Sequence, residues 1–323
     1  MWIISLSVLL DTRKKTINFN PYINNGKLNI LNSTSVLRNE NEVIKYIYAS
    51  ENQSVMLKHE ISLSQQGIGH FFKPSQAGTI LALIRALDGL ETREVFLNVG
   101  CNKGECAKGY FETMRTITRE LIPEMYSDNF HKNSDLFHSL LIDPNPSSDV
   151  KKSLNDLCEE YQQTKYLQIG VGSKATLSDI FISERAGDNC DHEWVITEPI
   201  NPKNDFKLDK PVNVDRLDNL WYKNYNVNFV PSYMRTMTNG NDLDILESCG
   251  SLIKDIKAIS LSLNGTAYNF NEIFMFLCSN DFTLLRVTPL GFIVVESERS
   301  VIDKCTVYRS YVAIKTHIFR EII

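Results

Sequence analysis

The feature that most constrains the fold is an alternation of short apolar runs with amphipathic segments between residues 95 and 172. VFLNV (95–99) is continuously apolar but for one Asn, and FHSLLID (137–143) and KYLQIGVG (165–172) follow it as further strand-like runs. Between them lie a glycine-containing turn with a helical segment, and the amphipathic helix KKSLNDLCEEYQQ (151–163). Strand, helix, strand, helix, strand predicts βαβ units with right-handed crossovers, hence an α/β fold with a doubly wound, mostly parallel sheet.

Further elements flank this core. AGTILALIRALDGL (77–90) predicts a helix that ends at Gly89, a typical C-cap residue. Its apolar residues are spaced three and four apart: Ile80, Leu83, Ile84 and Leu87. Residues 260–289 read as strand, loop, helix and strand. Residues 286–298 and 308–316 predict an antiparallel hairpin that closes the sheet edge.

Length and composition bound the organisation of the chain. Its 323 residues would allow one enlarged domain or two. With 43% apolar and 23% charged residues, a full core can form and wholesale disorder is excluded. Residues 1–74 are rich in Asn, Ser and Thr and predict an N-terminal extension or cap, whereas residues 75–323 predict the α/β domain.

Net charge and the N-terminal sequence limit the classes of partner and the locations that are expected for the protein. The net charge of -5 argues against general nucleic-acid binding, which needs a basic surface. MWIISLSVLL (1–10) is too short for a membrane span of about 20 residues. A cytoplasmic protein is therefore expected and membrane association is not. The alternative is the lumen of the secretory pathway, if residues 1–10 belong to a signal-anchor. The sequence leaves the oligomeric state open.

Cysteine spacing gives no metal signature. The seven cysteines are scattered without a repeating interval, which favours reduced thiols over a disulfide framework. Cys101 and Cys106 are the closest pair, and CxxxxC alone does not indicate zinc. A polar cluster in AGDNCDHEW (186–194) is typical of a solvated loop. We expect no metal site.

A glycine loop follows the first strand of the predicted sheet. In GCNKG (100–104), Gly100 and Gly104 would allow a tight turn and a close approach to the backbone. Amides just before a helix suit an anionic group. The loop matches neither the dinucleotide fingerprint GxGxxG nor the P-loop GxxxxGK[ST]. Nucleotide hydrolysis that depends on a phosphate-binding loop is therefore not expected.

An acidic residue ends the second strand. Asp143 in LLIDPNP stands where a carboxylate can accept hydrogen bonds from both hydroxyls of a ribose. The simpler alternative is an Asp that caps the following helix. Together with the glycine loop, Asp143 favours the binding of a nucleoside.

These motifs resemble those of the FkbM-type S-adenosylmethionine-dependent methyltransferases. VFLNVGCNKG is similar to the family's first motif, with Gly100, Asn102 and Gly104 matching and Asn98 standing where Asp is usual. LLIDPNP is similar to the second motif, an acidic residue followed by Pro-Asn-Pro, here Asp143 to Pro146.

The resemblance extends over roughly residues 75–300. LQIGVGSK, RLDNLW (216–221) and residues 233–253 are similar to later elements of the family. In the last of these, Arg235 replaces Lys and Met237 replaces Asp, whereas Gly240 and Asp242 are kept.

The resemblance implies a Rossmann-like methyltransferase fold that binds S-adenosylmethionine and methylates a hydroxyl of a sugar or other small molecule or glycan. The residues that it implies for cofactor binding are Asn98, Gly100, Asn102, Gly104, Asp143 and Asn145. Asp242 and Arg235 are the candidates for a catalytic role. The substitutions at Asn98 and Met237 keep an alternative open, a catalytically inactive methyltransferase-fold binding protein. A third hypothesis is an α/β enzyme that binds another nucleoside.

Overall fold

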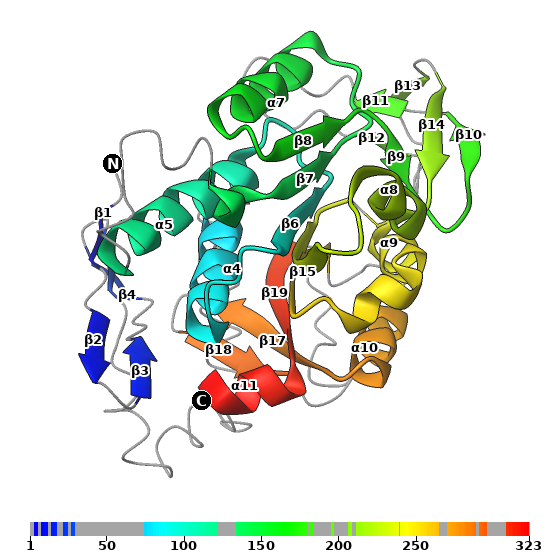
Figure 1. Ribbon diagram of the computed structural model, residues 1–323. Helices are drawn as coiled ribbons and strands as arrows, with labels where there is room; N and C mark the ends of the chain where they lie inside the picture. The colour runs from blue at the N-terminus through cyan, green and yellow to red at the C-terminus, as the bar shows by residue number, and fades with distance from the viewer. Residues whose placement is uncertain are drawn as a thin grey trace.

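A computed structural model describes short strands within residues 3–29 and most of the chain from residue 74 onward (Figure 1). The described ranges are 3–5, 8–11, 14–17, 22–24, 27–29, 74–121, 134–179, 181–183, 195–196, 206–208, 211–238, 240–264, 270–288, 291–295 and 308–322. The polar cluster within residues 186–194 lies outside them.

The centre of the molecule is an eight-stranded sheet with the order β18-β17-β19-β16-β15-β6-β7-β8. Its strands are β6 (Glu94–Val99), β7 (Ser139–Ile142), β8 (Thr164–Leu167), β15 (Val230–Thr236), β16 (Ala258–Asn264), β17 (Phe282–Thr288), β18 (Gly291–Val294) and β19 (Tyr308–Lys315). All neighbours from β8 to β16 are parallel, whereas β19 is antiparallel to β16 and β17. The sheet is therefore mostly parallel, as predicted.

Helices cover both faces of the sheet (Figure 1). One face packs against α4 (Pro74–Asp88), α5 (Glu105–Leu121) and α7 (Ser148–Glu160), with α11 (Thr316–Ile322) near its far edge. The other face packs against α8 (Leu217–Asn224), α9 (Asp242–Ser248), the 3-10 turn η3 (Gly250–Lys254) and α10 (Phe270–Ser279). A 3-10 turn, η2 (Asp135–Phe137), leads into β7. This is the doubly wound α/β arrangement that the alternation of elements predicts.

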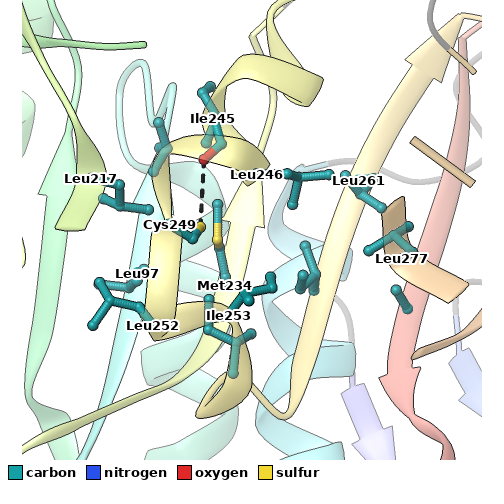
Figure 2. Packing of buried hydrophobic residues seen from close by; sticks show 14 of the residues in the cluster. Leu97, Leu217, Met234, Ile245, Leu246, Cys249, Leu252, Ile253, Leu261 and Leu277 are labelled. Carbon is teal, nitrogen blue, oxygen red and sulfur yellow. Dashed lines mark hydrogen bonds between the residues drawn. The ribbon is translucent and has the colours of Figure 1, made fainter. Parts of the chain in front are cut away.

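Alternation along the strands builds two separate apolar cores. On β6, Leu97 packs into the core under α8 to α10, and Phe96 packs into the core under α4 and α5. Figure 2 shows Leu97 and Met234 from neighbouring strands in the same apolar cluster as Ile245 and Leu246 of α9. In the same cluster the Cys249 thiol donates a hydrogen bond to the Ile245 carbonyl oxygen at 3.4 Å.

The helix before β6 forms as its periodicity predicts. The helix α4 ends at Asp88, and Gly89 follows with φ +119°, its N–H bonded to the Arg85 carbonyl oxygen at 3.0 Å. This conformation favours glycine. Because α4 packs against both the sheet and α5, it is buried on more than the one predicted face, and Leu81 and Ala82 are also inaccessible to solvent.

Two pairings differ from the prediction. The run KYLQIGVG divides into β8 and β9 (Gly170–Val171), and β9 leaves the main sheet to pair in parallel with β14 (Val212–Asp215). A Cβ at residue 170 would lie 2.9 Å from Val214 Cγ2, so glycine permits this contact. The C-terminal hairpin consists of β17 and β18, whereas β19 inserts between β16 and β17 and does not close the edge.

The remaining strands form small sheets. β10 (Thr176–Ser178) joins β14 and β9, and β11 (Phe181–Ser183) lies between β12 (Val195–Ile196) and β13 (Phe206–Leu208). In the N-terminal segment, β1 (Ile3–Ser5), β4 (Tyr22–Asn24) and β5 (Lys27–Asn29) form one sheet, and β2 (Val8–Asp11) pairs with β3 (Lys14–Ile17). The run of residues 1–10 thus contains two strands.

Within the described residues, no helix combines the length and apolar character needed to cross a membrane.

Candidate functional site

The candidate site lies where the chain reverses its direction of winding across the sheet. From β6 the chain proceeds through β7 to β8 on one side, and it returns through β15 to β16 on the other. In such sheets, ligands bind in the crevice outside the carboxyl ends of the strands at this switch point. Three loops meet here: residues 100–104 after β6, residues 143–147 after β7 and, after β15, residues 237–238 and 240–241.

The glycine loop is shaped by close packing against its neighbours. Gly100 and Gly104 have φ +71° and +78°. A Cβ at residue 100 would lie 2.3 Å from the Met237 carbonyl oxygen, and one at residue 104 would lie 2.4 Å from Leu157 Cδ1. Their N–H groups donate to the Ile142 and Cys101 carbonyl oxygens at 2.9 and 2.8 Å. Both glycines therefore satisfy packing and hydrogen bonding within the protein.

Asp143 holds the glycine loop to the end of β7. Its carboxylate accepts the Asn102 N–H at 2.5 Å through Oδ2 and the Asn145 N–H at 2.9 Å through Oδ1. Asn102 has φ +44°, a conformation that Asn tolerates better than most residues. Burial raises the pKa of Asp143, and the two amide hydrogen bonds oppose that rise. Asp143 as a whole residue is only 6% exposed to solvent.

Asn145 shapes the entry to α7. Its side-chain oxygen accepts the Ser147 N–H at 2.9 Å, and its carbonyl oxygen accepts a hydrogen bond from Gln168 Nε2 at 3.2 Å. The first bond is an Asx turn just before the helix. Asn145 thus uses its side-chain oxygen to form the turn that follows Asp143.

Asn98 and Arg235 are direct neighbours across β6 and β15, and Ser260 of β16 continues the same row. All three are buried, with 1%, 4% and 1% exposure respectively. Arg235 donates from Nη1 to Ser260 Oγ and from Nη2 to Met237 Sδ, both at 3.3 Å. In the described part of the chain, neither polar atom of the Asn98 amide has a hydrogen-bond partner.

The second catalytic candidate, Asp242, begins α9. The Thr236 hydroxyl donates to Asp242 Oδ1 at 2.6 Å. Burial raises the pKa of Asp242, and Thr236 and Arg235 oppose that rise. Asp242 is 1% exposed, whereas Asp244, two residues on, faces solvent. The structure therefore brings Arg235 and Asp242 to the same end of the sheet, close enough for each to shift the pKa of the other.

Asp218 in RLDNLW makes a structural contact. Its carboxylate pairs with Arg216, at 2.7 Å between Nη2 and Oδ2, and Arg216 Nη1 donates to the Ser173 carbonyl oxygen at 3.0 Å. A Cβ at residue 250 would lie 2.5 Å from Asp218 Oδ2, so Gly250 makes room for the pair. This network joins the loop after β9 to α8 and α9.

Ser260 is the site residue that sequence reasoning missed. The strand AISLSLN (258–264) alternates small or polar with apolar residues, which places Ser260 on the face opposite Leu261. That alternation was the available signal. The sequence alone does not give the neighbouring strand. The row that Ser260 forms with Arg235 and Asn98 depends on the register of the parallel strands.

Comparisons with known proteins yield only distant structural similarity. No family model and no curated protein matches the sequence. The chain is similar to the methyltransferase FkbM from Methylobacillus flagellatus KT, with a TM-score of 0.40 and 12% identity over 72% of this chain and 47% of that chain. It is also similar to precorrin-6y C5,15-methyltransferase from Geobacter metallireducens GS-15, with a TM-score of 0.33 and 9% identity over 74% of this chain and 88% of that chain. The chain thus spans about half the length of the first protein. The fold class itself rests on the order and direction of the strands in this chain.

Proposed function

We propose that the chain binds S-adenosylmethionine over the carboxyl ends of β6, β7 and β15 and transfers the methyl group to a hydroxyl of a small molecule or glycan. The observation that carries the proposal is the position of Asp143. Its carboxylate ends the strand next to the glycine loop and is bonded to that loop through the Asn102 amide. A carboxylate beside a glycine turn at the switch point is the arrangement that binds nucleosides in doubly wound folds.

The residues present fit the polar groups of this cofactor. A carboxylate has about four lone-pair positions, and Asp143 uses two of them for the Asn102 and Asn145 amides. The remaining lone pairs would accept the ribose hydroxyls. The Asn98 amide lacks a hydrogen-bond partner among the described residues, and leaving a buried polar group unsatisfied costs about 1–3 kcal/mol. A polar ligand beside Asn98 would remove that cost.

When bound, S-adenosylmethionine supplies an electrophilic methyl group, so the protein must align the acceptor and exclude water. The proposal assigns the acceptor's proton to Asp242, which is placed at this end of the sheet by the start of α9. A raised pKa brings a carboxyl group closer to the range useful for a general base at neutral pH.

Calorimetry with S-adenosylmethionine and S-adenosylhomocysteine tests the proposal. We expect saturable binding of both, and transfer of an isotopically labelled methyl group to a hydroxylated acceptor. The absence of binding at millimolar ligand would refute it. Binding of adenosine alone, without preference for either sulfur-containing ligand, would instead favour the third hypothesis, an enzyme for another nucleoside.

A second candidate function is a non-catalytic binding protein with this fold, and the surroundings of Met237 favour it. Its carbonyl oxygen limits the space beside Gly100, and its sulfur accepts a hydrogen bond from Arg235. A thioether can neither take a proton from an acceptor nor carry a charge. Binding of S-adenosylhomocysteine without methyl transfer to any of a panel of glycans and hydroxylated small molecules would support this candidate.

A further inference from the structure

A row of three polar side chains interrupts the apolar face that the sheet presents to α4 and α5. Cross-strand register aligns Asn98 of β6, Arg235 of β15 and Ser260 of β16. Leu141 of β7 continues the row on one side and Val312 of β19 on the other, and both belong to the core under α4 and α5. Burying polar groups in the middle of such an apolar row costs free energy unless the groups are hydrogen-bonded to the protein or to a ligand.

The charge of Arg235 has no direct counterpart in the described part of the chain. A guanidinium has five N–H donors, and Arg235 forms two contacts, both to uncharged atoms, Ser260 Oγ and Met237 Sδ. None of the ion pairs among the described residues includes it. A buried charge without a partner is among the most destabilising features a fold can contain.

The fully buried Arg85 of α4 shows what the chain does when an arginine is structural. Its guanidinium pairs with Glu94 at 3.2 Å and donates to the Tyr110 hydroxyl at 3.0 Å. It also donates to the carbonyl oxygens of Leu136 at 2.8 Å and Glu91 at 2.5 Å. The same sequence thus contains one buried arginine with a carboxylate partner and another whose contacts in the described part of the chain are to uncharged atoms.

The titratable groups that face Arg235 do not neutralise it by contact. From α5, burial raises the pKa of the Cys106 thiol to about 12, so this group is uncharged at neutral pH. From α9, Asp242 is held by the Thr236 hydroxyl, and burial raises its pKa. Cys106 also lies in the first turn of α5, where the helix dipole is positive and adds to the demand for an anion.

We propose that Arg235, with the Asn98 amide and the Ser260 hydroxyl, forms a buried site for a carboxylate. The proposal rests on the proposed function, in which this carboxylate belongs to the amino-acid end of S-adenosylmethionine. The planar guanidinium can donate two parallel hydrogen bonds to a carboxylate. Asn98 Nδ2 and Ser260 Oγ, its neighbours on the two adjacent strands, supply further donors.

Two nucleosides that differ in the amino-acid end test the site. S-Adenosylhomocysteine carries the carboxylate, and 5′-methylthioadenosine lacks it. We expect the wild-type chain to bind the former about 10- to 100-fold more tightly, the range for hydrogen bonds to charged groups. Arg235→Met should abolish this preference while the affinity for 5′-methylthioadenosine is kept, and Arg235→Lys should restore part of it. A preference that persists in Arg235→Met, or an equal loss of both affinities, would overturn the proposal.

Unfolding of the ligand-free protein in urea gives a second, independent readout. Arg235→Met should leave the midpoint unchanged or raise it, because an uncompensated charge is removed. The matched control Arg85→Met, or Arg85→Lys if the former does not fold, should lower it. An Arg235→Met chain that is as destabilised as the control, or that does not fold, would show that Arg235 is structural and overturn the site.

The two readouts also separate this inference from the proposed function. If the wild-type chain binds neither nucleoside, the proposed function fails, and the unfolding comparison alone decides the site. A stable Arg235→Met chain would then support a site for a different carboxylate ligand, whereas a destabilised one would remove both proposals.

Discussion

At the scale of single residues, the Asp143 carboxylate joins two loops and, in the proposed function, also binds the cofactor. Removing it in Asp143→Ala leaves the Asn102 and Asn145 amides without their acceptor. We expect the free energy of unfolding to fall by about 1–3 kcal/mol, and cofactor binding to weaken by a similar amount. Urea unfolding measures the first effect and calorimetry the second.

The control for this variant is Asp149→Ala, which removes an exposed carboxylate from the first turn of α7. It should change stability by less than about 1 kcal/mol, the scale of a helix-dipole contribution at the surface. If Asp143→Ala loses stability but binds with unchanged affinity, Asp143 is only the link between the two loops.

Sequence reasoning singled out these residues as candidates but could not give their hydrogen bonds. The position of Asp143 after a buried strand followed from local pattern, and the structure places it beside the glycine loop. That both of its oxygens accept main-chain amides depends on the turns at Asn102 and Asn145, whose geometry no spacing rule specifies. The pairing of Asn98 with Arg235 joins segments far apart in the chain, and only strand register determines it.

At the scale of elements, α4 and α5 cross at two glycines. A Cβ at residue 109 would lie 2.0 Å from the Ser75 carbonyl oxygen, and one at residue 78 would lie 2.0 Å from that of Cys106. In an exposed helix, Gly→Ala stabilises by about 1 kcal/mol. Here the sign should reverse, because the methyl group meets backbone, and overpacking costs about 1–3 kcal/mol.

We therefore expect Gly109→Ala to lower the free energy of unfolding, as measured in urea. The control is Glu112→Ala, at an exposed position on the same helix, which should change it little. Because α5 begins directly after the glycine loop, a displaced helix should also weaken cofactor binding. An unfolding midpoint above that of the wild type would contradict the close crossing.

Elements with strong local signals were predictable and non-local pairings were not. The strands around VFLNV and SLLI, and the helices at Pro74–Asp88 and Ser148–Glu160, followed from periodicity. The insertion of β19 between β16 and β17 did not, since an antiparallel strand can pair with either neighbour without changing its own pattern. The separation of β9 from β8 likewise depends on β14, more than 40 residues away.

At the scale of the whole molecule, charge is buried at both ends of the parallel strands. At the amino ends, Arg85 and Lys257 pair with Glu94, and Lys257 also pairs with Asp88. This cluster joins α4 to β6 and to the start of β16. At the carboxyl ends stand Asp143, Asp242 and Arg235, which share fewer direct contacts. Among the described residues, the ion pairs of buried groups thus lie at the amino ends, whereas the charged groups at the carboxyl ends are bonded to uncharged partners.

The pH dependence of stability should report these buried carboxyl groups. Burial raises the pKa of Asp143, Asp242 and Glu94. Between the ordinary pKa of such a group and its raised value, the folded chain binds more protons than the unfolded chain, so stability falls as the pH rises through that window. The loss of stability is absent well below the ordinary pKa, where the group is protonated in both states. It is complete above the raised pKa, where the group is ionised in both states.

Asp242→Asn isolates one of these groups, because an amide oxygen can still accept the Thr236 hydrogen bond but cannot ionise. Urea unfolding should give the variant and the wild type equal stability at a pH well below the ordinary Asp pKa of about 3.9, where Asp242 is protonated in both states. As the pH rises toward neutrality, the variant should gain relative to the wild type and then level off. Asp244→Asn removes the same charge from the exposed side of α9 and serves as the control. A wild type that becomes more stable than Asp242→Asn with rising pH would mean that Arg235 and Asp242 stabilise each other as an ion pair, and Arg235 would then need no external carboxylate.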